Sequence, residues 1–171
     1  MGGDDAGPSQ QGPDPAVDPP DAAGLVMRIA ILHGPNLNRL GKRNPEKYGT
    51  KSLDGIGEDV DAAAERLGVS AVHFQSNSEG ALVDWVHEHH ETLDAFVVNP
   101  AGLTPVAYPL LDALRDTGRP FAVVHISQWH ALDGRERADI FADSAAVYLA
   151  GAGWHGYALA LEALVFKATR P

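Results

Sequence analysis

The chain has 171 residues, of which 44 % are hydrophobic and 21 % are charged, as expected of one globular domain with a sizeable core. It contains no cysteine, which excludes disulfides, thiolate metal sites and cysteine nucleophiles. The formal net charge of −10 argues against non-specific nucleic-acid binding. No apolar run approaches the roughly 18 residues of a membrane span, so we expect neither a nucleic-acid partner nor a membrane partner.

Residues 1–26 are rich in Gly, Pro, Asp, Ala and Gln and carry no aromatic residue, Lys or Arg. Such a segment cannot bury enough apolar surface to offset its ordering entropy, so we predict a disordered tail followed by one domain over residues 27–171. The tail lacks the basic start and apolar centre of a signal peptide, and we therefore expect a cytoplasmic protein. Met27 directly precedes the first predicted strand and is a second candidate for the natural start.

Five short apolar runs, with the length and continuity of buried parallel strands, alternate with amphipathic segments. The predicted strands are residues 29–32, 69–74, 94–98, 121–126 and 145–149. The predicted helices are residues 53–67, the segment around 82–86, residues from about 104 to 116 and residues from about 157 to 166. Ser52 and Gly68 suit the caps of the first helix, and Pro105 suits the first turn of the third. The alternation predicts a three-layer α/β/α sandwich on a five-stranded parallel sheet.

Polar residues follow the ends of four predicted strands: His33 to Asn36, Ser76 to Glu79, Asn99 to Gly102, and His125 to Ser127. Ligands of such sheets bind beyond the carboxyl ends of the strands, so this edge is the predicted site. His125 suits a general acid or a hydrogen-bonded structural residue. Ser127 suits a carboxylate-binding group or a helix cap.

Two further groups at this edge have alternative interpretations. Asn36 and Asn99 can hold a water or an oxyanion, or they can bond their own turns. Gln75, Asn77 and Glu79 are interpreted as a helix-capping cluster. The histidines are scattered, which argues against a metal site, and no phosphate-binding glycine motif is present.

The loop after the first strand is long and cationic, and it contains one tyrosine, Tyr48. Arg43 lies five residues before it and can favour the phenolate, which allows a weak acid to serve as a base. The alternative is a solvated loop with a packed aromatic residue. Long loops between a strand and its helix are more often functional than idle.

Taken together, the segments resemble the type II 3-dehydroquinate dehydratases. The matching pieces, in order from Met27 onward, are HGPNLNRLGKRNPEKYG, QSNSEGALVDWVHE, NPAGLT with Asp112 beyond it, VHISQWHA and GAGWHGYALALEAL. The resemblance implies a flavodoxin-like fold and a small ketone substrate in the shikimate pathway of aromatic amino acid biosynthesis. It also implies that the enzyme uses no metal or organic cofactor and is a homo-oligomer, usually a dodecamer built from trimers.

The resemblance also implies a mechanism. Tyr48, activated by Arg43 on a mobile lid, would remove a proton next to a ketone. A water held by Asn36 would stabilise the enolate, and His125 would protonate the leaving hydroxyl. The other implied substrate-binding positions are Asn99, Gly102, Asp112, Ile126, Ser127 and Glu136.

This chain departs from the family pattern at four positions. Pro105 replaces a substrate-contacting His, Leu132 replaces an Arg, and Glu136 replaces the Arg expected to grip the substrate hydroxyls. Val123 replaces a Glu, so we expect His125 to lack a carboxylate that orients it. A site built to bond hydroxyls loses on the order of 10⁴-fold in discrimination when its bonding groups do not match.

The sequence therefore predicts a lyase that removes water from 3-dehydroquinate or a related β-hydroxy ketone through an enolate. A first alternative is a divergent homologue that acts on a more apolar ketone in specialised metabolism, by dehydration, isomerisation or cyclisation. Trp129 adds bulk beside the site. A second alternative is a non-catalytic relative that binds a small carboxylate.

Overall fold

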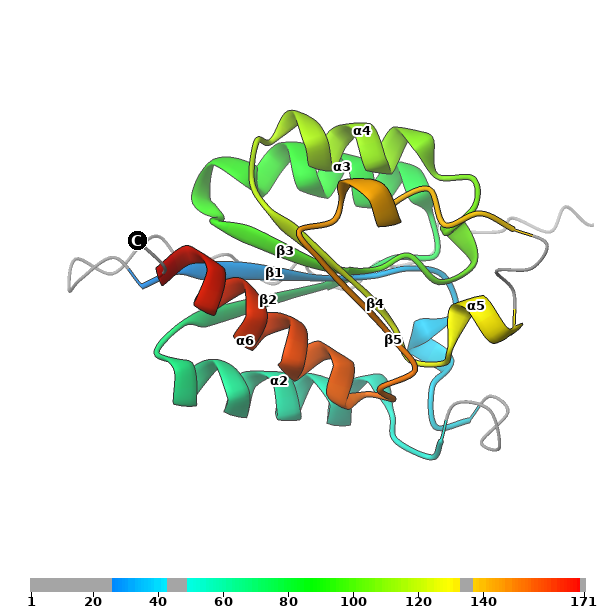
Figure 1. Ribbon diagram of the computed structural model, residues 1–171, viewed down its shortest axis with the longest axis horizontal. Helices are drawn as coiled ribbons and strands as arrows, with labels where there is room; N and C mark the ends of the chain where they lie inside the picture. The colour runs from blue at the N-terminus through cyan, green and yellow to red at the C-terminus, as the bar shows by residue number, and fades with distance from the viewer. Residues whose placement is uncertain (1–25, 43–48, 133–136, 170–171) are drawn as a thin grey trace, which may run out of the picture.

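The computed structural model describes residues 26–42, 49–132 and 137–169 (Figure 1). The predicted disordered tail, apart from its last residue, lies outside these ranges, as do Arg43, Tyr48 and Glu136. Within them, no helix has the length and apolar character needed to cross a lipid bilayer.

The centre of the fold is a five-stranded sheet in which neighbouring strands are parallel and ordered β2-β1-β3-β4-β5. Its strands are β1 Arg28–His33, β2 Ser70–Gln75, β3 Ala95–Asn99, β4 Phe121–His125 and β5 Val147–Ala150. The three inner strands are almost fully buried, which explains their continuous apolar runs. The prediction of a five-stranded parallel sheet is confirmed, and the strand order is that of flavodoxin-like folds.

Helices cover both faces of the sheet, as Figure 1 shows. Helices α2 (Leu53–Leu67) and α6 (His155–Thr169) lie on one face. Helices α3 (Glu79–His89) and α4 (Tyr108–Asp116) lie on the other. The described chain also has a short helix, α5, and four 3-10 turns: α5 Trp129–Leu132, η1 Leu37–Arg39, η2 His90–Thr92, η3 Ala101–Leu103 and η4 Ala142–Ser144.

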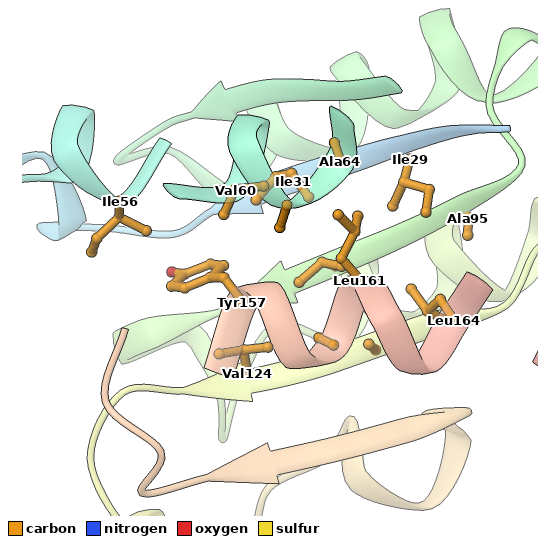
Figure 2. Packing of buried hydrophobic residues seen from close by; sticks show 14 of the residues in the cluster. Ile29, Ile31, Ile56, Val60, Ala64, Ala95, Val124, Tyr157, Leu161 and Leu164 are labelled. Atoms are coloured by element: carbon orange, nitrogen blue, oxygen red, sulfur yellow. The ribbon is translucent and has the colours of Figure 1, made fainter. Parts of the chain in front are cut away.

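Each face of the sheet has its own apolar core because successive strand residues point to opposite sides. Ile29 and Ile31 belong to the core under α2 and α6, whereas Ala30 and Leu32 belong to the core under α3 and α4. Figure 2 shows the first core, where Tyr157 and leucines of α6 pack between α2 and the sheet. Full burial of one such Leu or Ile contributes about 1.5–3 kcal/mol, so the two cores stabilise the sheet whose strand ends form the predicted site.

The third long helix starts later than the sequence predicted. It begins at Tyr108 with Pro109 in its first turn, so the prediction that it starts near Pro105 is wrong. The preceding residues form turns instead, because the buried Thr104 hydroxyl donates a hydrogen bond back to the carbonyl of Ala101 at 2.6 Å. A threonine that bonds its own local backbone competes with helix formation.

Two smaller differences concern the segment before β5. The stretch 127–139, where neither a helix nor a strand was predicted, contains the short helix α5 near its start. Strand β5 begins at Val147 rather than at Ala145, because the Ala145 N–H is bonded to the Phe141 carbonyl at 3.1 Å in the preceding turn. These turns matter for the site, because they bring Asp139 over the end of β4.

Candidate active site

The polar strand ends gather at one edge of the sheet, as predicted. The register pairs His33 with Gln75 on one side and with Asn99 on the other. Strand β4, which pairs with β3, ends at His125. Figure 1 shows this edge near α5 and the cyan turn that follows β1.

The turn after β1 is built so that Asn36 presents its side chain. Gly34 lies against the end of β3, where its N–H donates to the Asn99 carbonyl at 2.8 Å. Only glycine fits there, because a Cβ atom would lie 2.5 Å from the Pro100 carbonyl oxygen. Asn36 adopts a left-handed backbone conformation with φ 66°, and its N–H donates to Asn77 Oδ1 at 2.8 Å. Its exposed side chain has no hydrogen-bond partner among the described residues. Asn36 therefore does not use its side chain to bond its own turn.

The capping interpretation of residues 75–79 is only partly right. Ser78 caps α3 by accepting from the Ala81 N–H at 3.4 Å. Glu79 accepts from the Leu110 N–H in the first turn of α4 at 3.3 Å. Gln75, by contrast, donates at 3.3 Å to the Gly34 carbonyl, and with Asn77 it supports the turn that carries Asn36.

Asn99 is held by a buried network that the sequence did not reveal. Its Oδ1 accepts from the Ala101 N–H at 3.1 Å, and its Nδ2 donates to the Tyr157 hydroxyl at 2.9 Å. That hydroxyl also lies within hydrogen-bond distance of Nδ1 of His33, at 3.2 Å. The pattern GAGWHGYALALEAL contains Tyr157, but no local spacing connects it to Asn99.

The groups of this network are neutral. Burial, together with the nearby His73 ring, lowers the pKa of His33 to about 3. Burial also raises the pKa of the Tyr157 phenol, and the hydrogen bond from Asn99 opposes that rise only in part. Neutral, fully bonded groups orient the Asn99 amide without adding charge to the site.

His125 has a carboxylate partner, so the prediction that it lacks one is wrong. Its Nε2 lies 2.7 Å from Oδ2 of Asp139, and the two side chains are 5 % and 1 % exposed. Burial raises the pKa of Asp139, but the hydrogen bonds from His125 and the Phe141 N–H, together with the nearby Tyr148 hydroxyl, outweigh it and leave the pKa below its ordinary value. The carboxyl group is therefore ionised at neutral pH. Sequence reasoning missed Asp139 because it considered only position 123.

Two aromatic rings border the imidazole of His125. Trp129 stacks on it with a centroid distance of 5.1 Å and an interplanar angle of 23°. Tyr148 lies at 5.7 Å in a tilted arrangement, and its buried hydroxyl sits beside Asp139 without completing a hydrogen bond of ordinary geometry. Burial and the neighbouring carboxylate raise the pKa of this phenol. Trp129 is buried, which agrees with the bulk expected there.

The remaining predicted residues are distributed as follows. Ile126 and Ser127 follow His125 directly, and the Ser127 side chain has no hydrogen-bond partner within the described ranges, so it caps no helix there. Gly102 is exposed in η3. Asp112 lies on the exposed side of α4, 3.7 Å from Arg115, and the structure shows no hydrogen bond between it and the described residues of the sheet edge.

Arg43, Tyr48 and Glu136 lie outside the described residues. No cluster of three or more metal-ligating side chains occurs in the described part of the chain.

Comparisons with known proteins agree with this architecture. The sequence profile of the family "Dehydroquinase class II" matches residues 27–165. The 3-dehydroquinate dehydratase of Halothermothrix orenii is 41 % identical over 140 residues, covering 82 % of this chain and 95 % of the relative. That of Pseudoalteromonas translucida is 41 % identical over 139 residues, covering 81 % and 93 %.

Solved structures give the same result. The type II dehydroquinase from Propionibacterium acnes superposes with a TM-score of 0.76 at 31 % identity, covering 82 % of this chain and 99 % of that one. The enzyme from Butyrivibrio crossotus gives a TM-score of 0.78 at 28 % identity over the same shares. The chain therefore belongs to the dehydroquinase class II family, as its five sequence motifs indicated.

Proposed function

We propose that the protein removes water from 3-dehydroquinate through an enolate intermediate. The observation that carries this proposal is the arrangement at the sheet edge. The Asn36 amide has no hydrogen-bond partner among the described residues, Asn99 is fixed by a buried network, and His125 is paired with a buried carboxylate. A protein that only binds a small carboxylate has no need for an imidazole set against an ionised Asp139.

In the proposed reaction, the Tyr48 phenolate takes a proton from the carbon next to the ketone. The electron pair of the broken C–H bond moves into the carbonyl and forms an enolate, which a water held by Asn36 stabilises. Collapse of the enolate breaks the bond to the β-hydroxyl, and His125 gives a proton to the departing oxygen. The products are a conjugated enone and water, and Arg43 favours the phenolate that starts the cycle.

Substrate binding is assigned to the residues around these groups. Ile126 and Ser127, with their backbone N–H groups and the Ser127 hydroxyl, suit the substrate carboxylate. Asn99 is the last residue of β3, and Gly102 lies in the turn η3 that follows it. Asp112 and Glu136 complete the proposed set of substrate-binding residues. We also propose that the protein is a homo-oligomer, a dodecamer built from trimers, and that it is cytoplasmic.

A second candidate is a less hydroxylated, more apolar β-hydroxy ketone as substrate. The observation that favours it is the buried Trp129 ring stacked on His125, an apolar surface directly beside the proposed acid. Pro105, where the family pattern has a polar His, points the same way. The chemistry of proton removal and water loss is unchanged in this alternative.

The test is a spectrophotometric assay of enone formation from 3-dehydroquinate with the wild type, Tyr48→Phe and Tyr108→Phe. Tyr108 is 59 % exposed on α4, so its variant controls for the loss of a phenol elsewhere. Tyr48→Phe should lower kcat by about 10²- to 10⁴-fold, the usual contribution of a general base, and Tyr108→Phe should have no effect.

Absence of turnover by folded wild-type protein would reject 3-dehydroquinate as the substrate. The same assay with more apolar β-hydroxy ketones would then test the second candidate. Undiminished activity of Tyr48→Phe would instead reject Tyr48 as the base.

A further inference from the structure

We infer that Asp139 is the positioning residue of His125, and that it fixes which ring nitrogen faces the substrate. This inference deepens the proposed function and rests on His125 as the acid. It concerns a residue outside every motif that relates the chain to its family.

The carboxylate reaches His125 from a segment other than β4, the strand on which the family pattern places a Glu. Val123 and His125 point to the same face of β4, but Val123 is fully buried in the core under α3 and α4. Asp139 approaches from the segment that crosses that core before η4. The chain thus has no carboxylate on the strand at position 123 but supplies one from the covering segment.

Asp139 is held in place independently of His125. Its Oδ1 accepts from the Phe141 N–H at 3.0 Å, and the Phe141 ring is fully buried in the same core as Val123. The neighbouring Ile140 N–H donates to the Thr104 carbonyl at 3.3 Å. Although Asp139 is partly exposed as a residue, its side chain is only 1 % exposed, so the carboxylate cannot swing into solvent without unpacking the turn.

This geometry decides the tautomer of the imidazole. An ionised carboxylate only accepts hydrogen bonds, so His125 Nε2 carries a proton and donates to Asp139 Oδ2. Within the described ranges, Nε2 is the only nitrogen of this ring with a hydrogen-bond partner. Nδ1 is therefore the atom that gives its proton to the leaving hydroxyl, and the carboxylate stabilises the imidazolium beforehand. Trp129, stacked on the ring, limits its rotation.

The variant Asp139→Asn separates positioning from packing. Its amide oxygen can still accept from Phe141 and keep the turn, while its NH₂ group faces His125 Nε2. Nε2 must then accept, so the proton of the neutral ring moves to Nδ1. The exposed Asp143 in η4 provides a matched control, Asp143→Asn.

The experiment combines nitrogen-15 NMR of histidine-labelled protein with steady-state kinetics on 3-dehydroquinate. The His125 signals are assigned by their loss in His125→Gln. We expect the neutral ring to carry its proton on Nε2 in the wild type and in Asp143→Asn, and on Nδ1 in Asp139→Asn. We expect kcat of Asp139→Asn to fall on the order of 10²- to 10⁴-fold, with KM within about threefold, as when a catalytic His is left in the wrong tautomer.

The outcomes distinguish this inference from the proposed function. A wild-type ring protonated on Nδ1, or an unchanged tautomer and kcat in Asp139→Asn, would overturn the role of Asp139. A loss confined to KM would also overturn it, because positioning of the acid acts on the chemical step. Failure of the wild type to turn over 3-dehydroquinate would reject that substrate, while the NMR comparison would still decide whether Asp139 sets the tautomer.

Discussion

The side-chain amide of Asn99 donates a hydrogen bond to the hydroxyl of Tyr157, with 2.9 Å between the two atoms, although the residues are 58 positions apart. The bond joins the end of β3 to the first turn of α6. The same hydroxyl is also hydrogen-bonded with Nδ1 of His33, at 3.2 Å, so three strand-end and helix groups are locked into one arrangement behind the edge of the sheet. Residues locked in this way hold a site to the accuracy that catalysis needs.

Removal of the hydroxyl in Tyr157→Phe should leave both the Asn99 amide and His33 Nδ1 without a partner. An unpaired buried polar group costs about 1–3 kcal/mol, so the free energy of unfolding should fall by at least this amount. KM should rise as well, because the Asn99 amide loses its fixed orientation beside the substrate. Urea unfolding and steady-state kinetics measure the two effects, with the exposed Tyr108→Phe as control. Unchanged stability would show that the network contributes nothing.

His33 should make the protein sensitive to mild acid. Burial, with a contribution from His73, lowers the pKa of His33 from 6.5 to about 3, so the folded state does not bind this proton between those values. The unfolded chain binds it below pH 6.5, and stability is therefore lost as the pH falls through this window. Between pH 7 and 5 the loss should be about 2 kcal/mol, from about 1.36 kcal/mol per pKa unit.

The variant His33→Asn should remove this part of the pH dependence, whatever it does to stability at pH 7. The measurement is urea unfolding of both proteins at pH 7 and pH 5. Equal losses in the two proteins on acidification would show that His33 is not the responsible group.

The ionised carboxylate of Asp139 should stabilise the folded protein at pH values above 3.8, its ordinary pKa, and this stabilisation should be lost in acid. Its pKa is lowered from 3.8, because the hydrogen bonds to its carboxylate outweigh the opposing effect of burial. Its stabilisation is fully present above pH 3.8 and declines as the pH falls through the lower folded-state value. Relative to Asp139→Asn, the wild type should be more stable by about 1–3 kcal/mol at pH 5. Unfolding curves at pH 5 and pH 3 should show this gap narrowing, and a gap that widens in acid would contradict the sign.

Gly34 should not tolerate a side chain. A Cβ atom there would lie 2.5 Å from the Pro100 carbonyl oxygen and 3.0 Å from that of Asn99, both of which are backbone atoms. Gly34→Ala should therefore lower stability by about 1–3 kcal/mol or more and reduce activity, because it displaces the turns that carry Asn36 and Asn99.

The matched control is Gly57→Ala in α2, where the nearest atom to the added Cβ is 3.9 Å away. This substitution should raise stability by about 0.5–1 kcal/mol, because alanine favours a helix interior. Thermal unfolding and kcat/KM of both variants test the contrast. Similar effects from the two substitutions would mean that the close approach of the backbones is not limiting.

Much of the fold followed from local patterns. Continuous apolar runs such as Ile29 to Leu32 are typical of buried parallel strands, and their alternation with amphipathic segments predicted the sheet and its functional edge. The start of α4 was mispredicted because Pro105 suits a helix start in isolation, whereas Thr104 is held by the turn it caps. Local propensity is a weak guide wherever a buried contact opposes it.

The sequence by itself determined the class of fold, the family and the edge at which His125, Asn36 and Asn99 meet, because strand periodicity and motif order are properties of short segments. Only the tertiary structure decided which groups hold them. Asp139 pairs with His125, and Tyr157 with Asn99, because packing over the sheet brings distant segments to within hydrogen-bond distance. These distances cannot be read from the spacing of residues along the chain, because they depend on how the segments that carry Asp139 and Tyr157 pack against the sheet.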